Sequence, residues 1–162
     1  MELRDYLMPG EYILTVFTNL DISPGNFNGL AVTNKRIILF STKSGVGKLF
    51  RKNRPEDIKN LKSVFFKNTP LIKMEVYEGS LGSSKIISLT RCVKFVRNDG
   101  SWSYGEDGII GILKSKLSGP QISEIKETLE HTLMSLALKT EYHYSEKDKA
   151  WIIKFIFKPQ EE

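Results

Sequence analysis

Residues 28–40 read NGLAVTNKRIILF, two short apolar runs separated by a polar Thr-Asn-Lys-Arg step. Each run is rich in β-branched and long aliphatic residues, which is typical of strands. Asn34 and Lys35 suit a tight reversal, because Asn tolerates turn conformations and positive φ better than most residues. The stretch predicts an antiparallel strand pair that contributes Leu30, Val32, Ile37 and Leu39 to one core, with Arg36 in a structural role.

Further strand signals occur before and after this pair. Period-two alternation or β-branched content predicts strands in the stretches EYILTVFT (11–18), DIKNLKSVFFK (57–67), LIKMEVYEG (71–79), KIISLT (85–90) and RCVKFVR (91–97). The intervals at 19–29 and 44–57 are rich in turn residues and are predicted as loops, and the Asp-Gly step at 99–100 predicts a turn. Residues 106–119 are ambiguous between helix and loop, because their glycines weaken a helix.

One amphipathic helix is predicted over residues 120–139. Pro120 suits a first helical position. Apolar residues then recur at three- and four-residue steps, which leaves acidic and basic side chains for water. The apolar stripe consists of Ile122, Ile125, Leu129, Leu133 and Leu136.

The last part of the chain predicts a second hairpin, around residues 146–149. In its final strand Trp151, Ile153, Phe155 and Phe157 share one face. Such a strand either extends the main sheet or pairs with another copy of the chain. Tyr142, Tyr144 and Trp151 are therefore a candidate partner interface, and the competing interpretation is that the hairpin packs on its own domain.

The totals are those of a soluble globular domain. The chain has 162 residues, of which 40% are apolar and 27% charged. No apolar stretch approaches the roughly 18–20 residues that span a bilayer, and the first residues do not form a signal peptide. A single cysteine, Cys92, forms no internal disulfide, which favours a cytoplasmic setting. We expect a main domain over 1–139, with a hairpin and tail over 140–162 packed on it or extending it.

Positive charge is concentrated between residues 43 and 67. Eight Lys or Arg residues there oppose only Glu56 and Asp57, so the segment carries +6 while the whole chain carries +5. Such a region attracts phosphate or carboxylate groups, although basic residues in surface loops are also commonly just solvated.

PGEYIL (9–14), a spacer and GLAVTNKRIILF (29–40) resemble the N-terminal pattern of bacterial PH-like and GRAM-like domains. In those families a Gly-Glu start precedes two strands joined by a Thr-Asn/Asp-x-Arg step. The resemblance implies a mainly β, α+β fold: a strongly bent antiparallel sheet or partly open barrel of about seven strands, capped by one C-terminal helix. It also implies a binding platform for acidic lipids, ubiquitin or peptides. A weaker similarity to GLUE domains, which bind lipid and ubiquitin, points the same way.

PH domains that bind phosphoinositides often carry Lys, a gap, and then Lys/Arg-x-Arg. The matching order here, with the basic residues beside it, gives a predicted ligand site of Lys43, Lys48, Arg51, Lys52 and Arg54. Leu49 and Phe50 are candidate membrane contacts between these cations. The motif lies one connection later than is usual in the family.

Other chemistries are disfavoured. SGVGK (44–48) lacks the spacing of a phosphate-binding P-loop. Cys92 is expected to be buried, and neither His131, which is predicted to face solvent, nor His143 has an evident catalytic partner. We therefore expect no catalytic residues, no metal site and no cofactor. Aromatic residues beside cations leave single-stranded nucleic-acid binding as a lesser alternative, although Phe65, Phe66 and Phe95 are better explained as core.

The sequence thus predicts a non-enzymatic PH/GRAM-like module, cytoplasmic or peripheral at a membrane. Its predicted partner is an acidic phospholipid surface or another protein, reached through the basic loop. The alternative is an assembly module that binds ubiquitin or a peptide, or that forms homo-oligomers through the C-terminal hairpin.

Overall fold

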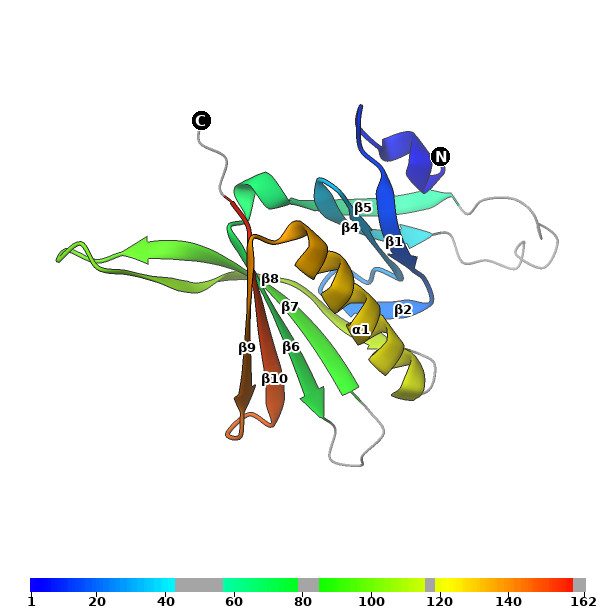
Figure 1. The fold of residues 1–162 in the computed structure, drawn as a ribbon. Coiled ribbons are helices and arrows are strands. Elements are labelled where there is room, and N and C mark those ends of the chain that lie inside the picture. The colour runs from blue at the N-terminus through cyan, green and yellow to red at the C-terminus, as the bar shows by residue number, and fades with distance from the viewer. Residues whose placement is uncertain (43–56, 79–84, 116–118, 159–162) are drawn as a thin grey trace.

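The computed structural model describes residues 1–42, 57–78, 85–115 and 119–158 (Figure 1). These residues form two antiparallel sheets and one α-helix, which confirms the mainly β prediction. They contain ten strands rather than about seven, and the sheets do not close into a barrel. In chain order the elements are η1 Leu3–Tyr6, β1 Ile13–Phe17, β2 Leu20–Ser23, β3 Gly29–Thr33, β4 Arg36–Thr42, β5 Ile58–Phe65, η3 Phe66–Asn68, β6 Leu71–Glu78, β7 Lys85–Val96, β8 Trp102–Ser115, α1 Gly119–Leu136, β9 Lys139–Ser145 and β10 Ala150–Ile156.

The first sheet has the strand order β1-β3-β4-β5. Its centre is the predicted hairpin, in which Leu30 lies opposite Leu39 and Val32 opposite Ile37. These four side chains belong to the main core between the sheets. The outer face is also covered, because Ala31, Ile38 and Phe40 pack beneath Leu3 and Leu7 of the N-terminal segment.

The Thr-Asn-Lys-Arg step binds the N-terminal segment to this sheet. Arg36 donates through Nε and Nη2 to the two carboxylate oxygens of Glu11, each at 2.9 Å, and Thr33 Oγ1 donates to Glu11 at 2.6 Å. The Asn34 side chain accepts from the Tyr12 N–H at 2.9 Å and donates to the Gly10 carbonyl. Asn34 turns the chain without the positive φ that we expected, and it serves mainly through these hydrogen bonds. The step is therefore structural, as predicted for Arg36.

Burial alone would raise the pKa of the Glu11 carboxyl. Hydrogen bonds from Arg36, Thr33 and the Met8 N–H outweigh that effect, so the pKa is held below its ordinary value. Arg36 also donates to the Tyr6 carbonyl and to Ser63 Oγ. The pair is thus a hydrogen-bonded ion pair with almost no solvent contact.

The second sheet has the order β2-β8-β7-β6-β10-β9. β2 follows β1 after a bend at Asn19, whose φ is +58°, and carries the chain from the first sheet to the second. The prediction of a loop over 19–29 was therefore wrong at this strand. β2 has four residues, of which only Leu20 and Ile22 are buried. This alternation is too short for the strand to be recognised from the sequence.

The C-terminal hairpin extends the second sheet. β10 pairs with β6, placing Ile153 opposite Met74 and Phe155 opposite Ile72, while β9 forms the outer edge. Ile153, Phe155 and Phe157 are buried on one face, as predicted. Two arrangements were considered for this hairpin. The structure shows the one in which the hairpin joins the main sheet.

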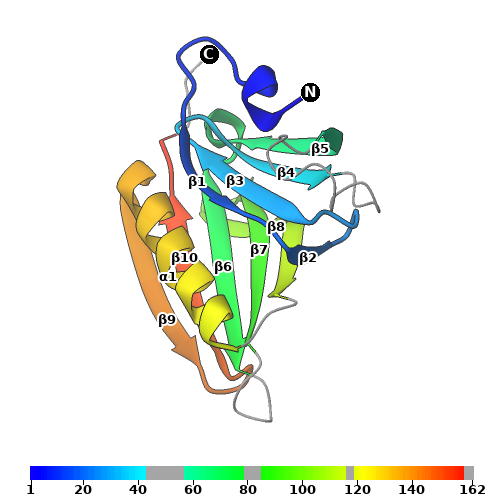
Figure 2. The same cartoon turned by 90° about the vertical axis from the view of Figure 1, so that its right-hand side faces the viewer.

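Helix α1 lies against both sheets (Figure 2) and contributes Ile122, Leu129 and Leu133 to the core. It ends at Leu136 rather than at residue 139, because the Leu138 N–H donates to the Ile156 carbonyl and β9 begins at Lys139. Residues 106–115, for which we expected helix or loop, are strand β8. Two of its glycines, Gly105 and Gly111, accommodate close neighbours: a Cβ on Gly105 would lie 2.3 Å from the Phe95 ring.

β7 and β8 continue past the end of their neighbour β6. Cys92 lies opposite Leu71, the first residue of β6, so residues 93–105 form a two-stranded ribbon that projects from the body (Figure 1). We call these residues the arm. The Phe95 side chain on it is 50% exposed, so its assignment to the core was wrong, whereas Phe66 is buried.

Candidate ligand-binding site

The predicted basic site lies outside the described residues. Lys43, Lys48, Leu49, Phe50, Arg51, Lys52 and Arg54 all fall within residues 43–56. That segment precedes β5 in the chain, whereas a hollow of ligand size lies at the other end of β5.

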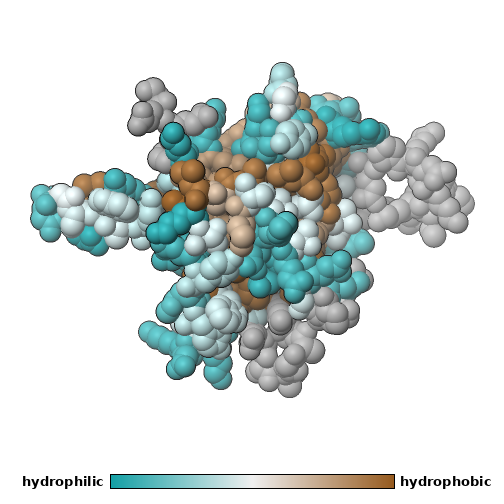
Figure 3. Space-filling view, viewed as in Figure 1, coloured by the Kyte–Doolittle hydropathy of each residue, from teal (hydrophilic) through white to brown (hydrophobic). Residues whose placement is uncertain are grey.

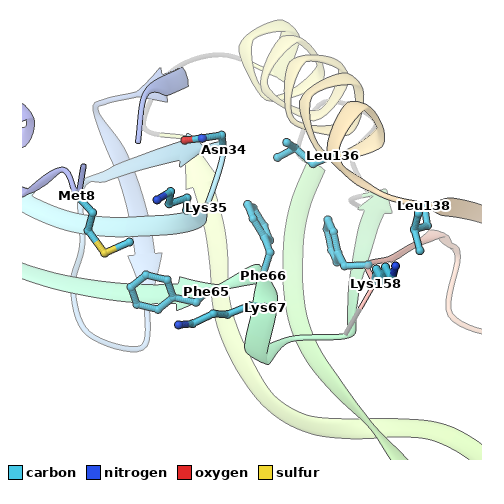
Figure 4. Close-up of a pocket in the computed structure, with 10 residues that line it drawn as sticks. Met8, Asn34, Lys35, Phe65, Phe66, Lys67, Leu136, Leu138 and Lys158 are labelled. Atoms are coloured by element: carbon cyan, nitrogen blue, oxygen red, sulfur yellow. The ribbon is translucent and has the colours of Figure 1, made fainter. Parts of the chain in front are cut away.

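This hollow, which we call the lysine pocket, has a volume of about 450 Å³. It is built where the β3–β4 turn, the η3 turn, the end of α1 and the chain leaving β10 meet (Figure 4). The volume is within the range of small-molecule sites. Its lining consists of Met8, Asn34, Lys35, Phe65, Phe66, Lys67, Leu136, Leu138, Phe157 and Lys158.

Aromatic side chains give the lysine pocket a firm wall. The Phe66 and Phe157 rings stack with centroids 4.9 Å apart and planes 23° apart, and both are buried. Backbone hydrogen bonds hold them, since the Phe66 N–H donates to the Lys35 carbonyl and the Phe157 N–H to the Pro70 carbonyl. The wall therefore does not depend on a ligand to be ordered.

The charges around the lysine pocket all have one sign. Lys35, Lys67 and Lys158 line it, and no Asp or Glu is among the described residues of the lining. Lys35 Nζ donates to the Pro9 carbonyl at 3.0 Å, and Lys67 Nζ lies 6.0 Å from the Phe65 ring centroid. Within the described chain none of the three forms an ion pair. Such an arrangement favours an anion, because no fixed carboxylate competes for the cations.

The rim of the lysine pocket is apolar. Leu138 is 70% exposed and Met8 is 37% exposed, and both lie beside the lysines in Figure 4. An anion held here would thus have apolar surface next to it. This combination suits a ligand that carries both a negative group and a hydrophobic part.

The candidate interface on the C-terminal hairpin is assembled as its spacing suggested. Tyr144 lies opposite Trp151 and Tyr142 opposite Ile153, which puts the three aromatic side chains on one face. The Tyr144 and Trp151 rings are 5.1 Å apart, and all three side chains are exposed. Partial burial, with Glu130 of α1 alongside, raises the pKa of Tyr142.

A polar cluster lies on the outer face of β6, opposite the core. Lys73 forms ion pairs with Glu75 and Glu106, and Tyr77 donates to Glu75 at 2.5 Å. The hydrogen bond to Glu75 raises the pKa of Tyr77 to about 12. Burial would lower the pKa of Lys73, but its bonds to Glu106 and Glu75 raise it to about 12. Both groups stay protonated at neutral pH and so supply no nucleophile or base there.

The remaining reactive side chains have no catalytic arrangement in the described chain. Cys92 is buried, and that burial raises the pKa of its thiol, which makes the thiolate scarce. His131 and His143 are exposed. In residues 1–42, 57–78, 85–115 and 119–158, no cluster of three His, Cys, Asp or Glu side chains is placed to hold a metal ion. None of the helices described there is long and apolar enough to cross a membrane.

The sequence missed the lysine pocket because its parts are distant in the chain. Lys67 belongs to the basic segment, but Lys35 lies in a turn that we interpreted as structural and Lys158 in the tail of the last strand. No spacing rule links positions 35, 67 and 158. Only the meeting of β10 with β6 brings Phe157 and Lys158 beside η3.

Comparison with known proteins leaves the site to be judged on its own geometry. No protein-family model, curated protein or solved structure matches this chain. The resemblance to PH-like and GRAM-like domains therefore stays a prediction.

Proposed function

We propose that this protein is a non-enzymatic binding module of the PH/GRAM-like kind that recognises acidic phospholipid at a membrane surface. The observation that carries the proposal is the lysine pocket, where three lysines that form no ion pair within the described residues line a hollow with a stacked aromatic wall. Eight strands followed by one helix, with a further hairpin added to the second sheet, are compatible with such a fold.

The ligand is expected to enter by its headgroup. Lys35, Lys67 and Lys158 attract the phosphate, while Met8 and Leu138 at the rim meet the acyl boundary. A hollow of about 450 Å³ holds a headgroup and glycerol but leaves the acyl chains in the bilayer. The attraction is electrostatic, so binding should weaken as salt shortens the Debye length to about 8 Å near 0.15 M.

Vesicle sedimentation tests this function. We expect the protein to sediment with vesicles of phosphatidylcholine and phosphatidylserine and not with phosphatidylcholine alone. Lys67→Glu/Lys158→Glu should lower the bound fraction at least tenfold, since each reversal replaces an attraction by a repulsion. Lys114→Glu/Lys147→Glu is the matched control, because both lysines are exposed, neither lines the lysine pocket, and the net charge changes equally.

The basic loop gives the competing location for the same function. A Lys48→Glu/Arg51→Glu/Lys52→Glu/Arg54→Glu variant tests it in parallel. Loss of binding in the loop variant alone would move the site from the lysine pocket to the loop. Equal sedimentation of wild type and both variants would remove the lipid function altogether.

A second candidate function is recognition of a protein. It is favoured by one observation, the exposed aromatic face of Tyr142, Tyr144 and Trp151 on the edge hairpin. Tyr144→Ser/Trp151→Ser removes that face and leaves the lysine pocket intact. If ubiquitin titrated into the labelled protein shifts resonances of the wild type but not of this variant, the second function replaces the first.

A further inference from the structure

The arm exposes apolar surface that nothing in the described chain covers. Phe95 and Trp102 are each 50% exposed and Val96 is 67% exposed. Figure 1 shows the arm extending away from both sheets, and Figure 3 shows apolar residues among the polar ones on it. An isolated two-stranded ribbon is marginally stable in water, so such a projection is expected to pack on something else.

The arm also carries positive charge that has no carboxylate partner in the part of the chain that the structure describes. Lys94 Nζ lies 4.5 Å from the Trp102 ring centroid. Arg97 donates to the hydroxyls of Ser101 and Ser103. Among the described residues neither cation forms an ion pair. The surface that receives the arm should therefore be apolar with carboxylates at its margin.

The free edge of the first sheet is suited to backbone pairing with a strand of the arm. β1 is an end strand, and residues 12–18, YILTVFT, carry no charge. The other end strands are blunted, since β5 and β9 carry lysines and β2 has four residues with Asp21 among them. Leu14 and Val16 on β1 are 40% and 42% exposed. An uncharged, β-prone edge of this kind is suited to pairing with another strand.

A hollow of about 370 Å³ lies between β1 and α1. Val16, Phe17 and Ile125 supply its apolar walls. Glu124 lines it, and Glu127 follows one helical turn later; both are exposed and form no ion pair within the described residues. This receiving surface thus has the apolar walls and marginal carboxylates that the arm requires.

We propose that the arm of one copy of this chain docks on β1 and α1 of a second copy. A strand of the arm pairs with the β1 edge. Val96 and Trp102, on one face of the arm, cover Leu14 and Val16, while Phe95 and Arg97, on the other face, meet α1 beside Glu124 and Glu127. Lys94 adds to the positive charge of the arm. In Figure 1 the arm points away from β1, so the contact joins two molecules. The polar tip, Arg97–Ser101, argues against end-on entry into a membrane, because it would bury Asn98 and Asp99 first.

Light scattering on the full chain, over a range of concentrations, tests the contact. We expect a wild-type mass at least twice 18.5 kDa. Lys94→Glu/Arg97→Glu and Glu124→Lys/Glu127→Lys should each return the mass to that of one chain, because like charges then face each other. Mixing the two variants should restore assembly, since a reversed arm then meets a reversed helix face. Trp102→Ser should weaken assembly without a charge change.

Three outcomes would overturn the contact. The first is a single-chain mass for the wild type at every concentration. The second is assembly that survives both charge reversals. The third is assembly that is lost only in Tyr144→Ser/Trp151→Ser, which assigns it to the C-terminal hairpin. Circular dichroism of each variant separates lost assembly from lost folding. Because the measurement contains no lipid, its failure leaves the lysine pocket unaffected.

Discussion

At the residue scale, the most consequential contact is the pair of Glu11 and Arg36. Their side chains are 0% and 7% exposed, and hydrogen bonds to Thr33, Ser63 and the Tyr6 carbonyl complete the network. A buried ion pair contributes little over an apolar pair, but breaking one leaves a buried charge without compensation. The network thus gives a structural reason for Glu11 of PGEYIL to occur together with Arg36 of the Thr-Asn-Lys-Arg step.

Glu11→Gln should lower the free energy of unfolding at pH 7 by about 3 kcal/mol, because Arg36 keeps its charge and loses its counter-charge. The pKa of Glu11 is lowered in the folded state, so its carboxylate stabilises the fold above the unfolded pKa of about 4.3. That contribution disappears as the pH falls through the lower folded value. Urea unfolding at pH 7 and pH 3 should therefore show the two proteins converging in acid.

Glu141→Gln is the control for this substitution. Its partner Lys139 and Glu141 itself are 67% and 46% exposed, so the loss should stay below about 1 kcal/mol. A Glu11→Gln variant as stable as Glu141→Gln would mean that the buried pair does not secure the N-terminal segment.

At the element scale, β8 shows how neighbours override local signals. Its glycines weakened both helix and strand patterns in the sequence. In the structure two irregularities in its pairing with β7 use extra residues on the β8 side, and Gly111 lies close to Ile22 of β2. The strand is therefore defined by what packs on it rather than by its own residues.

The C-terminal hairpin is an element on which the fold depends. Phe155→Ala should lower the free energy of unfolding by about 3–5 kcal/mol, because Phe155 is a fully buried core residue on the strand next to β6. Trp151→Ala on the same strand should cost far less, since that side chain is 46% exposed. Urea unfolding of the two variants measures the difference, and equal losses would contradict the burial of β10.

A chain ending at Thr140 should accordingly fail to fold. It would lose Ile153, Phe155 and Phe157 from the core and open the edge of β6. Point substitutions, rather than this truncation, are therefore the proper means to separate assembly from stability. A cooperative unfolding transition in the truncated chain would show that 1–139 folds alone.

At the scale of the whole molecule, the sequence predicted the individual strands and the helix better than the way they pack together. The β3–β4 hairpin, the helix and the C-terminal hairpin were recognisable because hydrophobic periodicity records which face of an element is buried. Two sheets in place of one bent sheet, and the short β2 that joins them, were not recognisable from local periodicity.

The lysine pocket was hidden for the same reason. It requires Lys35, Lys67 and Lys158 to line one hollow, and the place of Lys158 there depends on β10 pairing with β6. The predicted basic loop shares only its general chemistry with that site, an excess of positive charge. Charge composition therefore suggests an acidic ligand for either site, while the location of the lysine pocket depends on the fold.

The two proposed surfaces make one joint prediction about membranes. A molecule assembled through the arm presents two or more lysine pockets, and a second contact with the same vesicle benefits from a high effective concentration. Lys94→Glu/Arg97→Glu should therefore weaken sedimentation with phosphatidylserine vesicles by roughly tenfold or more. Its affinity for short-chain, monomeric phosphatidylserine in calorimetry should stay unchanged, because the arm does not line the lysine pocket. If both affinities fall together, the arm itself contacts lipid; if neither falls, assembly does not contribute to membrane binding.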